Sequence, residues 1–164
     1  MSSSVHLVEE YGPSWPPGPF ELGTDGPRLL VVAVDGSPTS LRAAAFAAGL
    51  ARRQKSRLAV VYVASPSKWT GVGAATVSAV QEQAFNELVD DLRRQIRARI
   101  DEIGIPVTFM VRRGDAFAEI RQAATEMKAD SVVVGASEHA GHRIIGSVAL
   151  RLVRVGQWPV TVVP

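Results

Sequence analysis

Hydrophobic residues follow two alternating patterns along most of the chain. Continuous apolar runs rich in β-branched residues alternate with stretches in which apolar residues recur every three or four positions. The runs are typical of strands buried on both faces, and the spaced positions are typical of amphipathic helices. The pattern therefore predicts five strands, at residues 29–34, 58–63, 105–111, 131–135 and 159–163.

Four helices are predicted between these strands. The first begins after Ser37-Pro38, because Ser is a good N-cap and Pro fits the first helical position. Its apolar spacing predicts that the sheet-facing side consists of Leu41, Ala44, Ala48 and Ala51. The others are a long helix ending at Gly104, a helix opening at 114–115 and a helix over 147–155 that stops at Gly156.

The order of these elements predicts the fold class. Strands that alternate with helices imply right-handed crossovers and a parallel sheet with helices on both faces. We therefore expect an α/β domain with a five-stranded parallel sheet sandwiched by helices. The third strand is expected at an edge of this sheet, because Pro106 removes a backbone donor near its start.

The first 27 residues have a different composition. They are rich in Pro and Gly and contain four acidic residues but no Lys or Arg. Because Pro disfavours helix before it, residues 1–27 are predicted to form an acidic extended tail, followed by one domain over 28–164. Trp15 and Phe20 are expected to pin part of this tail to the domain. A further hypothesis is that the tail covers the ends of the strands.

Composition narrows the function classes. The chain is 46% hydrophobic and 21% charged, which excludes a wholly disordered protein. No apolar run approaches the roughly 20 residues of a membrane span, so no membrane partner is expected. The chain has no Cys, which excludes disulfides and thiolate metal sites. His139 and His142 lack further ligands, so no metal site is predicted.

The uneven charge has two open interpretations, a basic surface for an anionic partner or a solvated surface with an Arg-rich composition. The net charge is +2, and the acidic tail makes the remainder more basic than the whole chain. A basic body suits nucleotide phosphates or nucleic acid. The arginines of the long helix have no aromatic residues among them on which bases could stack, so nucleic-acid binding is not expected.

Candidate site residues follow the predicted strands. Ligands of open parallel sheets bind beyond the carboxyl ends of the strands. Asp35 follows the first strand, Val63 ends the second and Gly135 ends the fourth. The Asp35 carboxylate has two open interpretations, since it can accept a hydrogen bond from a ribose hydroxyl or from the backbone of its own turn.

The segment between Gly135 and Ser147 is a candidate phosphate site. Gly146 permits close backbone approach, and the following helix offers free N–H groups together with the Ser147 hydroxyl. Arg143 adds a positive charge. A plain helix N-terminus explains Gly146 and Ser147 equally well. The chain contains no P-loop motif, no dinucleotide-binding glycine motif after the first strand and no evident general acid–base pair, so no catalytic residue is predicted.

Taken together, these motifs resemble the universal stress protein family from about Arg28 to Pro164. The resemblance rests on Val34-Asp35-Gly36-Ser37, Gly114-Asp115, Val132-Val133-Val134-Gly135, Gly146-Ser147-Val148 and the terminal segment 158–163. It implies a Rossmann-like three-layer fold of the adenine nucleotide alpha-hydrolase type, with strand order 3-2-1-4-5. It also implies a cytoplasmic stress-response protein. Because no catalytic base is visible in the sequence, no enzymatic activity beyond slow ATP hydrolysis is predicted.

The resemblance further implies that ATP or another adenine nucleotide, with Mg²⁺ as a possible companion, binds at the ends of the first, second and fourth strands. The residues implied to bind it are Ala33, Val34, Asp35, Val63, Val134, Gly135, Ser137, Arg143, Gly146, Ser147 and Val148.

The glycine loop departs from the family pattern Gly-x-x-Gly-x9-Gly-Ser/Thr. Glu138 stands where the second glycine is expected, and seven rather than nine residues separate it from Gly146. A carboxylate at this position would repel phosphates. The alternative function therefore stays open: a nucleotide-free dimeric interaction or regulatory module with a degenerate phosphate loop.

The last predicted strand is a candidate dimer interface. Residues 158–163 are largely apolar and end the chain, so this strand would form an edge that needs cover. The family resemblance implies a homodimer in which this strand of one copy faces the same strand of the other.

Overall fold

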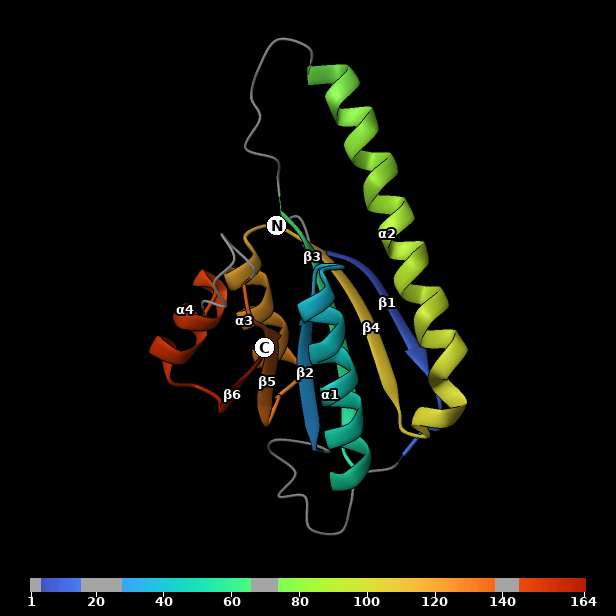
Figure 1. Ribbon diagram of the computed structural model, residues 1–164, viewed down its shortest axis with the longest axis vertical. Coiled ribbons are helices and arrows are strands. Elements are labelled where there is room, and N and C mark those ends of the chain that lie inside the picture. The colour runs from blue at the N-terminus through green and yellow to red at the C-terminus, as the bar shows by residue number, and fades with distance from the viewer. Residues whose placement is uncertain (1–3, 16–27, 66–73, 138–144) are drawn as a thin grey trace.

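The computed structural model describes residues 4–15, 28–65, 74–137 and 145–164 (Figure 1). Its helices and strands are, in chain order, β1 (Val5–Tyr11), β2 (Leu29–Val34), α1 (Pro38–Gln54), β3 (Arg57–Ala64), α2 (Ala74–Ile103), β4 (Val107–Arg113), α3 (Ala116–Glu126), β5 (Ser131–Gly135), α4 (Ser147–Val155) and β6 (Val160–Val163).

The described strands form one mixed sheet in the order β1-β4-β3-β2-β5-β6. The prediction of five strands is wrong, because β1 pairs antiparallel with β4 as a sixth. The other neighbouring strands pair in parallel, as expected for an α/β protein. Without β1 the order is β4-β3-β2-β5-β6, which is the predicted succession of the five parallel strands.

Strand β1 lies in the segment that was predicted to be a tail. Alternate β1 side chains are half-buried, and Leu7 and Tyr11 pack against the core. Because β1 lies outside β4, the expectation that the third predicted strand is an edge is wrong. Pro106 precedes β4 and therefore removes no hydrogen bond within it. Trp15 packs against the core as predicted, whereas Phe20 lies outside the described residues.

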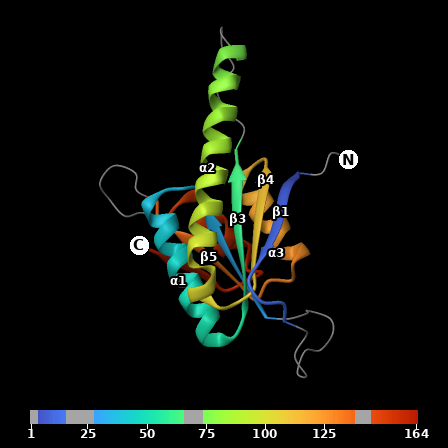
Figure 2. The ribbon, with the colours of Figure 1, turned by 90° about the vertical axis from the view of Figure 1, so that its right-hand side faces the viewer.

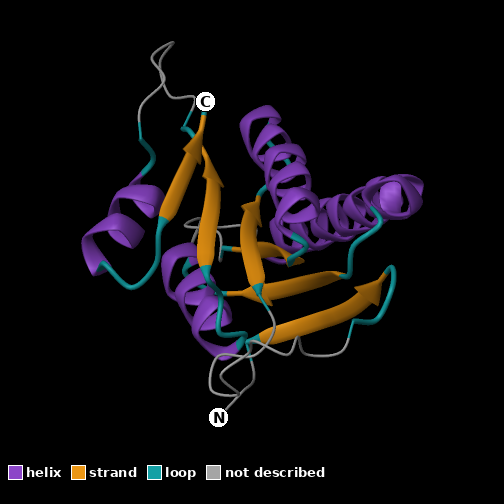
Figure 3. Cartoon of the chain, turned by 90° about the horizontal axis from the view of Figure 1, so that it is seen from below, coloured by secondary structure: helices purple, strands orange, loops and turns teal. Residues whose placement is uncertain are grey.

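The sheet separates two layers of helices. Helices α1 and α2 cover one face, and α3 and α4 cover the other (Figures 2 and 3). Successive residues of the central strands point to opposite faces, so Val32 packs towards α1 and Val31 towards α3. The N-terminal part of α2 projects beyond the sheet.

The ends of the helices agree with the sequence. Ser37 caps α1 by accepting a hydrogen bond from the Ser40 N–H, and Asp115 caps α3 in the same way. Gly104 and Gly156, with φ of +64° and +66°, lie directly after α2 and α4. No described helix has the length and hydropathy needed to cross a membrane.

The buried face of α1 differs by one position from the prediction. Ala43, Ala47 and Ala51 are fully buried against the sheet, whereas Ala44 and Ala48 are only half-buried. Because α1 contains many alanines, the sequence is compatible with burying either the face of Ala43 and Ala47 or the face of Ala44 and Ala48. A second row of small residues, which includes Ala44 and Ala48, therefore lies where α1 meets both the sheet and α2.

Candidate functional site

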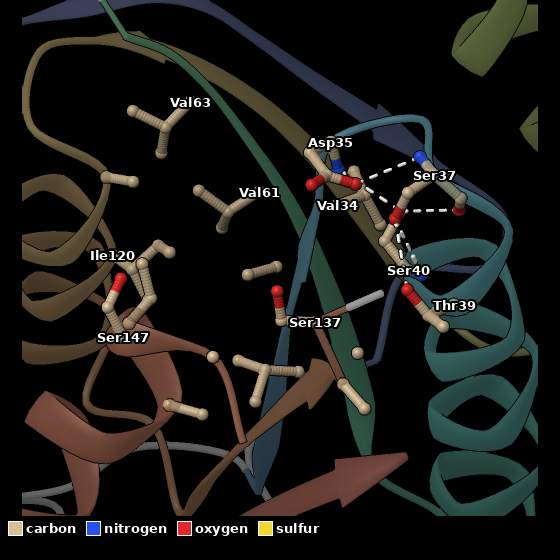
Figure 4. Close-up of a pocket in the computed structure, with 18 residues that line it drawn as sticks. Val34, Asp35, Ser37, Thr39, Ser40, Val61, Val63, Ile120, Ser137 and Ser147 are labelled. Carbon is tan, nitrogen blue, oxygen red and sulfur yellow. Dashed lines mark hydrogen bonds between the residues drawn. The ribbon is translucent and has the colours of Figure 1, made fainter. Parts of the chain in front are cut away.

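A cavity of about 220 Å³ opens where the carboxyl ends of β2, β3 and β5 meet the first turns of α1, α3 and α4 (Figure 4). This is the place where strand order reverses, because β3 and β5 lie on either side of β2. Its walls are largely apolar and include Ala33, Val34, Val61, Val63, Ile120, Val134 and Val148.

Every predicted site residue that the structure describes lines this cavity. The set consists of Ala33, Val34, Asp35, Val63, Val134, Gly135, Ser137, Gly146, Ser147 and Val148. Arg143 and Glu138 belong to residues 138–144, which lie outside the described part of the chain. The sequence therefore predicted which described residues come together, while nucleotide binding by them stays a prediction.

Asp35 forms the turn between β2 and α1. Its Oδ1 accepts a hydrogen bond from the Ser37 N–H at 2.9 Å, and its own N–H donates to Ser40 Oγ at 3.2 Å. Gly36 between them has a φ of +82°, which glycine adopts without strain. Asp35 is exposed to solvent as well as lining the cavity. The turn interpretation is thus confirmed, and the carboxylate still has acceptor capacity for a ligand.

The surroundings of Asp35 favour its charged form. Partial desolvation raises the pKa of the Asp35 carboxyl, but hydrogen bonds from Ser37 and Ser40 outweigh this effect and hold the pKa below its usual value. At neutral pH the group is therefore an anionic acceptor. Among the described lining residues, it is the one charged side chain.

Three hydroxyl groups beside Asp35 were missed as site residues. Ser37, Thr39 and Ser40 line the cavity from the start of α1, and Thr39 and Ser40 are buried. Ser40 Oγ donates to the Ser37 carbonyl at 2.9 Å, and the Ser37 and Thr39 hydroxyls lie 3.2 Å apart. The sequence signal was a cluster of hydroxyl residues in the first turn of a helix after a strand, but it was assigned to helix capping alone.

The two described glycines of the phosphate loop have different environments. A Cβ atom on Gly135 would lie 2.7 Å from the Thr39 carbonyl carbon and 2.8 Å from the Ser40 nitrogen, so the contact between β5 and α1 requires glycine there. Gly146 is the N-cap of α4 and has no side chain to cap the first turn. This helix end is suited to an anion, because unpaired N–H groups carry partial positive charge.

The architecture is that of a Rossmann-like α/β protein with a cavity at the topological switch point. A family model for the universal stress protein family matches residues 28–164. The chain belongs to this family. Strand β1 lies outside the matched residues.

One similar relative is the universal stress protein MJ0531 of Methanocaldococcus jannaschii. It is 27% identical over 138 residues, which cover 83% of this chain and 81% of the relative. The universal stress protein UspA from Lactobacillus plantarum has a solved structure similar to this one. It has a TM-score of 0.72 and 21% identity, and the match covers 84% of this chain and 97% of that protein.

Two further solved structures with this fold contain nucleotides. A universal stress protein in complex with cAMP has a TM-score of 0.62 and 24% identity, with 84% of this chain and 97% of that chain covered. A universal stress protein family protein from Arabidopsis thaliana with AMP bound has a TM-score of 0.57 and 18% identity, with 84% and 91% covered.

Proposed function

We propose that this universal stress protein binds an adenine nucleotide in the cavity at the carboxyl ends of β2, β3 and β5. One observation carries the proposal: an ionised carboxylate and an uncapped helix N-terminus lie on the wall of the same apolar cavity. The cAMP and AMP complexes with the same fold support it. The wider role proposed is that of a cytoplasmic stress-response protein.

Each part of a nucleotide has a chemical counterpart in the proposed site. The apolar side chains of Val61 and Val63 suit the adenine ring, and the Asp35 carboxylate can accept a hydrogen bond from a ribose hydroxyl. Phosphates would lie towards Gly146 and Ser147 at the start of α4. Any magnesium ion would enter with the phosphates, as Mg²⁺ does in many nucleotide sites.

A second candidate function is a nucleotide-free, dimeric interaction module. The observation that favours it is the packing of Gly135, which explains this glycine without any phosphate. Glu138 and the shortened spacing to Gly146 favour it as well. Under this alternative the cavity is a consequence of the fold, and β6 at the edge of the sheet is the interaction surface.

Calorimetric titration of ATP, AMP and cAMP into the wild-type protein and Asp35→Asn distinguishes the two candidates. Binding that weakens at least about tenfold in the variant is expected, because a hydrogen bond to a charged group contributes roughly 1.5–3 kcal/mol. Preference for AMP over ATP would indicate that the nucleoside pocket works without a triphosphate cradle.

The matched control is Asp130→Asn. The Asp130 Oδ2 accepts a hydrogen bond from the Leu29 N–H at the opposite end of β2, so this variant removes a carboxylate without touching the cavity. It should bind like the wild type. No heat with any of the three nucleotides, from protein that is folded, would overturn the nucleotide proposal and favour the interaction module.

A further inference from the structure

A second cavity, of about 260 Å³, lies between α1, α2 and the sheet. We call it the α1–α2 groove. Among the described lining residues it shares only Val34 with the candidate nucleotide site, which opens towards α3 and α4. Its floor and walls are mainly aliphatic, and they include Leu41, Ala44, Ala45, Ala48, Leu58, Val60, Leu92, Ile96, Ile103 and Val107.

The groove exists because α1 presents small residues to α2. Ala44, Ala45, Ala48 and Gly49 line it from α1, and none of them can reach across to the opposite wall. A Cβ atom on Gly49 would meet only the guanidinium of Arg53, with its Nη1 at 3.2 Å. Glycine is less favourable than alanine inside a helix, and Gly49 is not among the glycines whose positive φ would explain its presence.

Positive charge is placed at the mouth of the groove. Arg52 from α1 and Arg99 from α2 both line it and are exposed, together with a single carboxylate, Glu102. In the described part of the chain neither arginine forms an ion pair, whereas Arg93 and Arg113 are each paired with a glutamate. An aliphatic trough with two unpaired guanidinium groups is complementary to an amphipathic anion.

We propose that the α1–α2 groove binds a single-chain alkyl carboxylate, with the chain along the aliphatic walls and the carboxylate at Arg52 and Arg99. The aliphatic lining suits a methylene chain, since each methylene removed from water contributes about 0.8 kcal/mol. The carboxylate suits the arginines because guanidinium groups hold carboxylates through paired hydrogen bonds. This site is independent of nucleotide binding.

The first test is a titration of the full chain with octanoate, decanoate and dodecanoate below their micelle concentrations. Affinity should rise about fourfold per added methylene until the groove is filled, as follows from 0.8 kcal/mol per methylene. Dodecyltrimethylammonium has the same chain with the opposite charge and should bind at least tenfold more weakly than dodecanoate. Equal binding of the two would overturn the assignment of the carboxylate to the arginines.

Two kinds of variant test the location. Ala48→Leu fills the groove, and the double variant Arg52→Gln with Arg99→Gln removes the charges at its mouth. Each should weaken dodecanoate binding at least tenfold. The matched controls are Ala98→Leu and Arg154→Gln, which change exposed positions of α2 and α4 outside the groove and should bind like the wild type.

The glutamine variants keep the test valid if Ala48→Leu fails to fold. Unchanged dodecanoate binding in all folded groove variants, or affinity independent of chain length, would overturn the proposal. Asp35→Asn should leave dodecanoate binding unchanged, so failure here and failure of the nucleotide proposal are separate outcomes.

Discussion

Two glycines illustrate how single residues shape the two cavities. Gly135→Ala would place a methyl group within 3 Å of the backbone of Thr39 and Ser40. Overpacking of this kind typically costs about 1–3 kcal/mol, so we expect the free energy of unfolding to fall by that amount in urea titrations. Gly49→Ala should have the opposite effect in the same assay, a gain of up to about 1 kcal/mol, because a helical glycine is replaced and the nearest neighbour of the new methyl group, the Arg53 guanidinium at 3.2 Å, is the end of a flexible side chain that can move.

Equal stability of Gly135→Ala and the wild type would contradict the packing explanation of this glycine. The sequence could not distinguish that explanation from a phosphate site. The glycine motif is visible in the sequence, but the backbone it touches belongs to a helix far away along the chain. The position of Asp35 was predictable because it depends only on where the first parallel strand ends.

Arg112 shows a second limit of sequence reasoning at this scale. Its guanidinium is completely buried and donates at 2.8 Å to both Glu119 and Glu126 on α3, and to the Ser4 hydroxyl at 2.9 Å. Burial lowers the pKa of Arg112, but these hydrogen bonds to Glu126 and Glu119 outweigh it and keep the group charged. The burial of Arg112 could not be predicted from the sequence. Arg112 follows an apolar run, and the residues that bind its guanidinium belong to α3 and to the segment before β1.

Among the elements, β1 was the one that the sequence analysis missed. Its inward positions are Val5, Leu7, Glu9 and Tyr11, and the carboxylate at the third position breaks the apolar alternation. Glu9 is tolerated there because Arg93 on α2 donates to it at 3.0 Å through Nε. The surrounding prolines added to the impression of a tail. The parallel strands were predictable because they are continuous apolar runs that need no such partner.

The contact between β1 and α2 predicts a pH dependence. Hydrogen bonds from Arg93 lower the pKa of Glu9 below its usual value of about 4.5, against a smaller opposing effect of burial. A carboxyl group whose pKa is lower in the folded state than in the unfolded state stabilises the fold at pH values above its unfolded-state pKa. This stabilisation is lost as the pH falls through the folded-state pKa. Glu9→Gln should therefore reduce the free energy of unfolding by about 1 kcal/mol at pH 7, since both side chains are partly solvated, and by less at pH 3.5.

Urea titrations at the two pH values measure this difference. The control is Glu87→Gln, whose exposed carboxylate accepts a hydrogen bond from Gln83 on the same helix. It should stay close to the wild type at both pH values. A loss in Glu9→Gln that is the same at pH 3.5 as at pH 7 would show that the ion pair with Arg93 does not anchor β1.

At the scale of the whole molecule, the two edges of the sheet differ. Among the described strands, β1 forms one edge and pairs only with β4, while β6 forms the other edge and pairs only with β5. The two edges differ in their side chains, because β1 carries the charged residues Glu9 and Glu10 whereas β6 has the sequence Val-Thr-Val-Val. An uncovered edge strand with apolar side chains is suited to pairing with another chain. The residues of β6 are only half-buried in the single chain, so a second copy would remove further apolar surface from water. We therefore predict a homodimer formed by the segment 158–163.

Thr161→Lys tests this dimer. Thr161 lies in the middle of β6, so two copies that meet there would bring like charges close together, and the variant should be a monomer at micromolar concentration in light scattering. Thr125→Lys is the control, because it places the same charge on the exposed surface of α3 and should keep the mass of the wild type. A monomeric wild type, or a dimer that persists in Thr161→Lys, would contradict pairing through β6. If Thr161→Lys remains a dimer and still binds nucleotide, the nucleotide site is unaffected and the dimer interface lies elsewhere. The exposed side of α4, where Leu150 and Val153 lie, would then be the next surface to test.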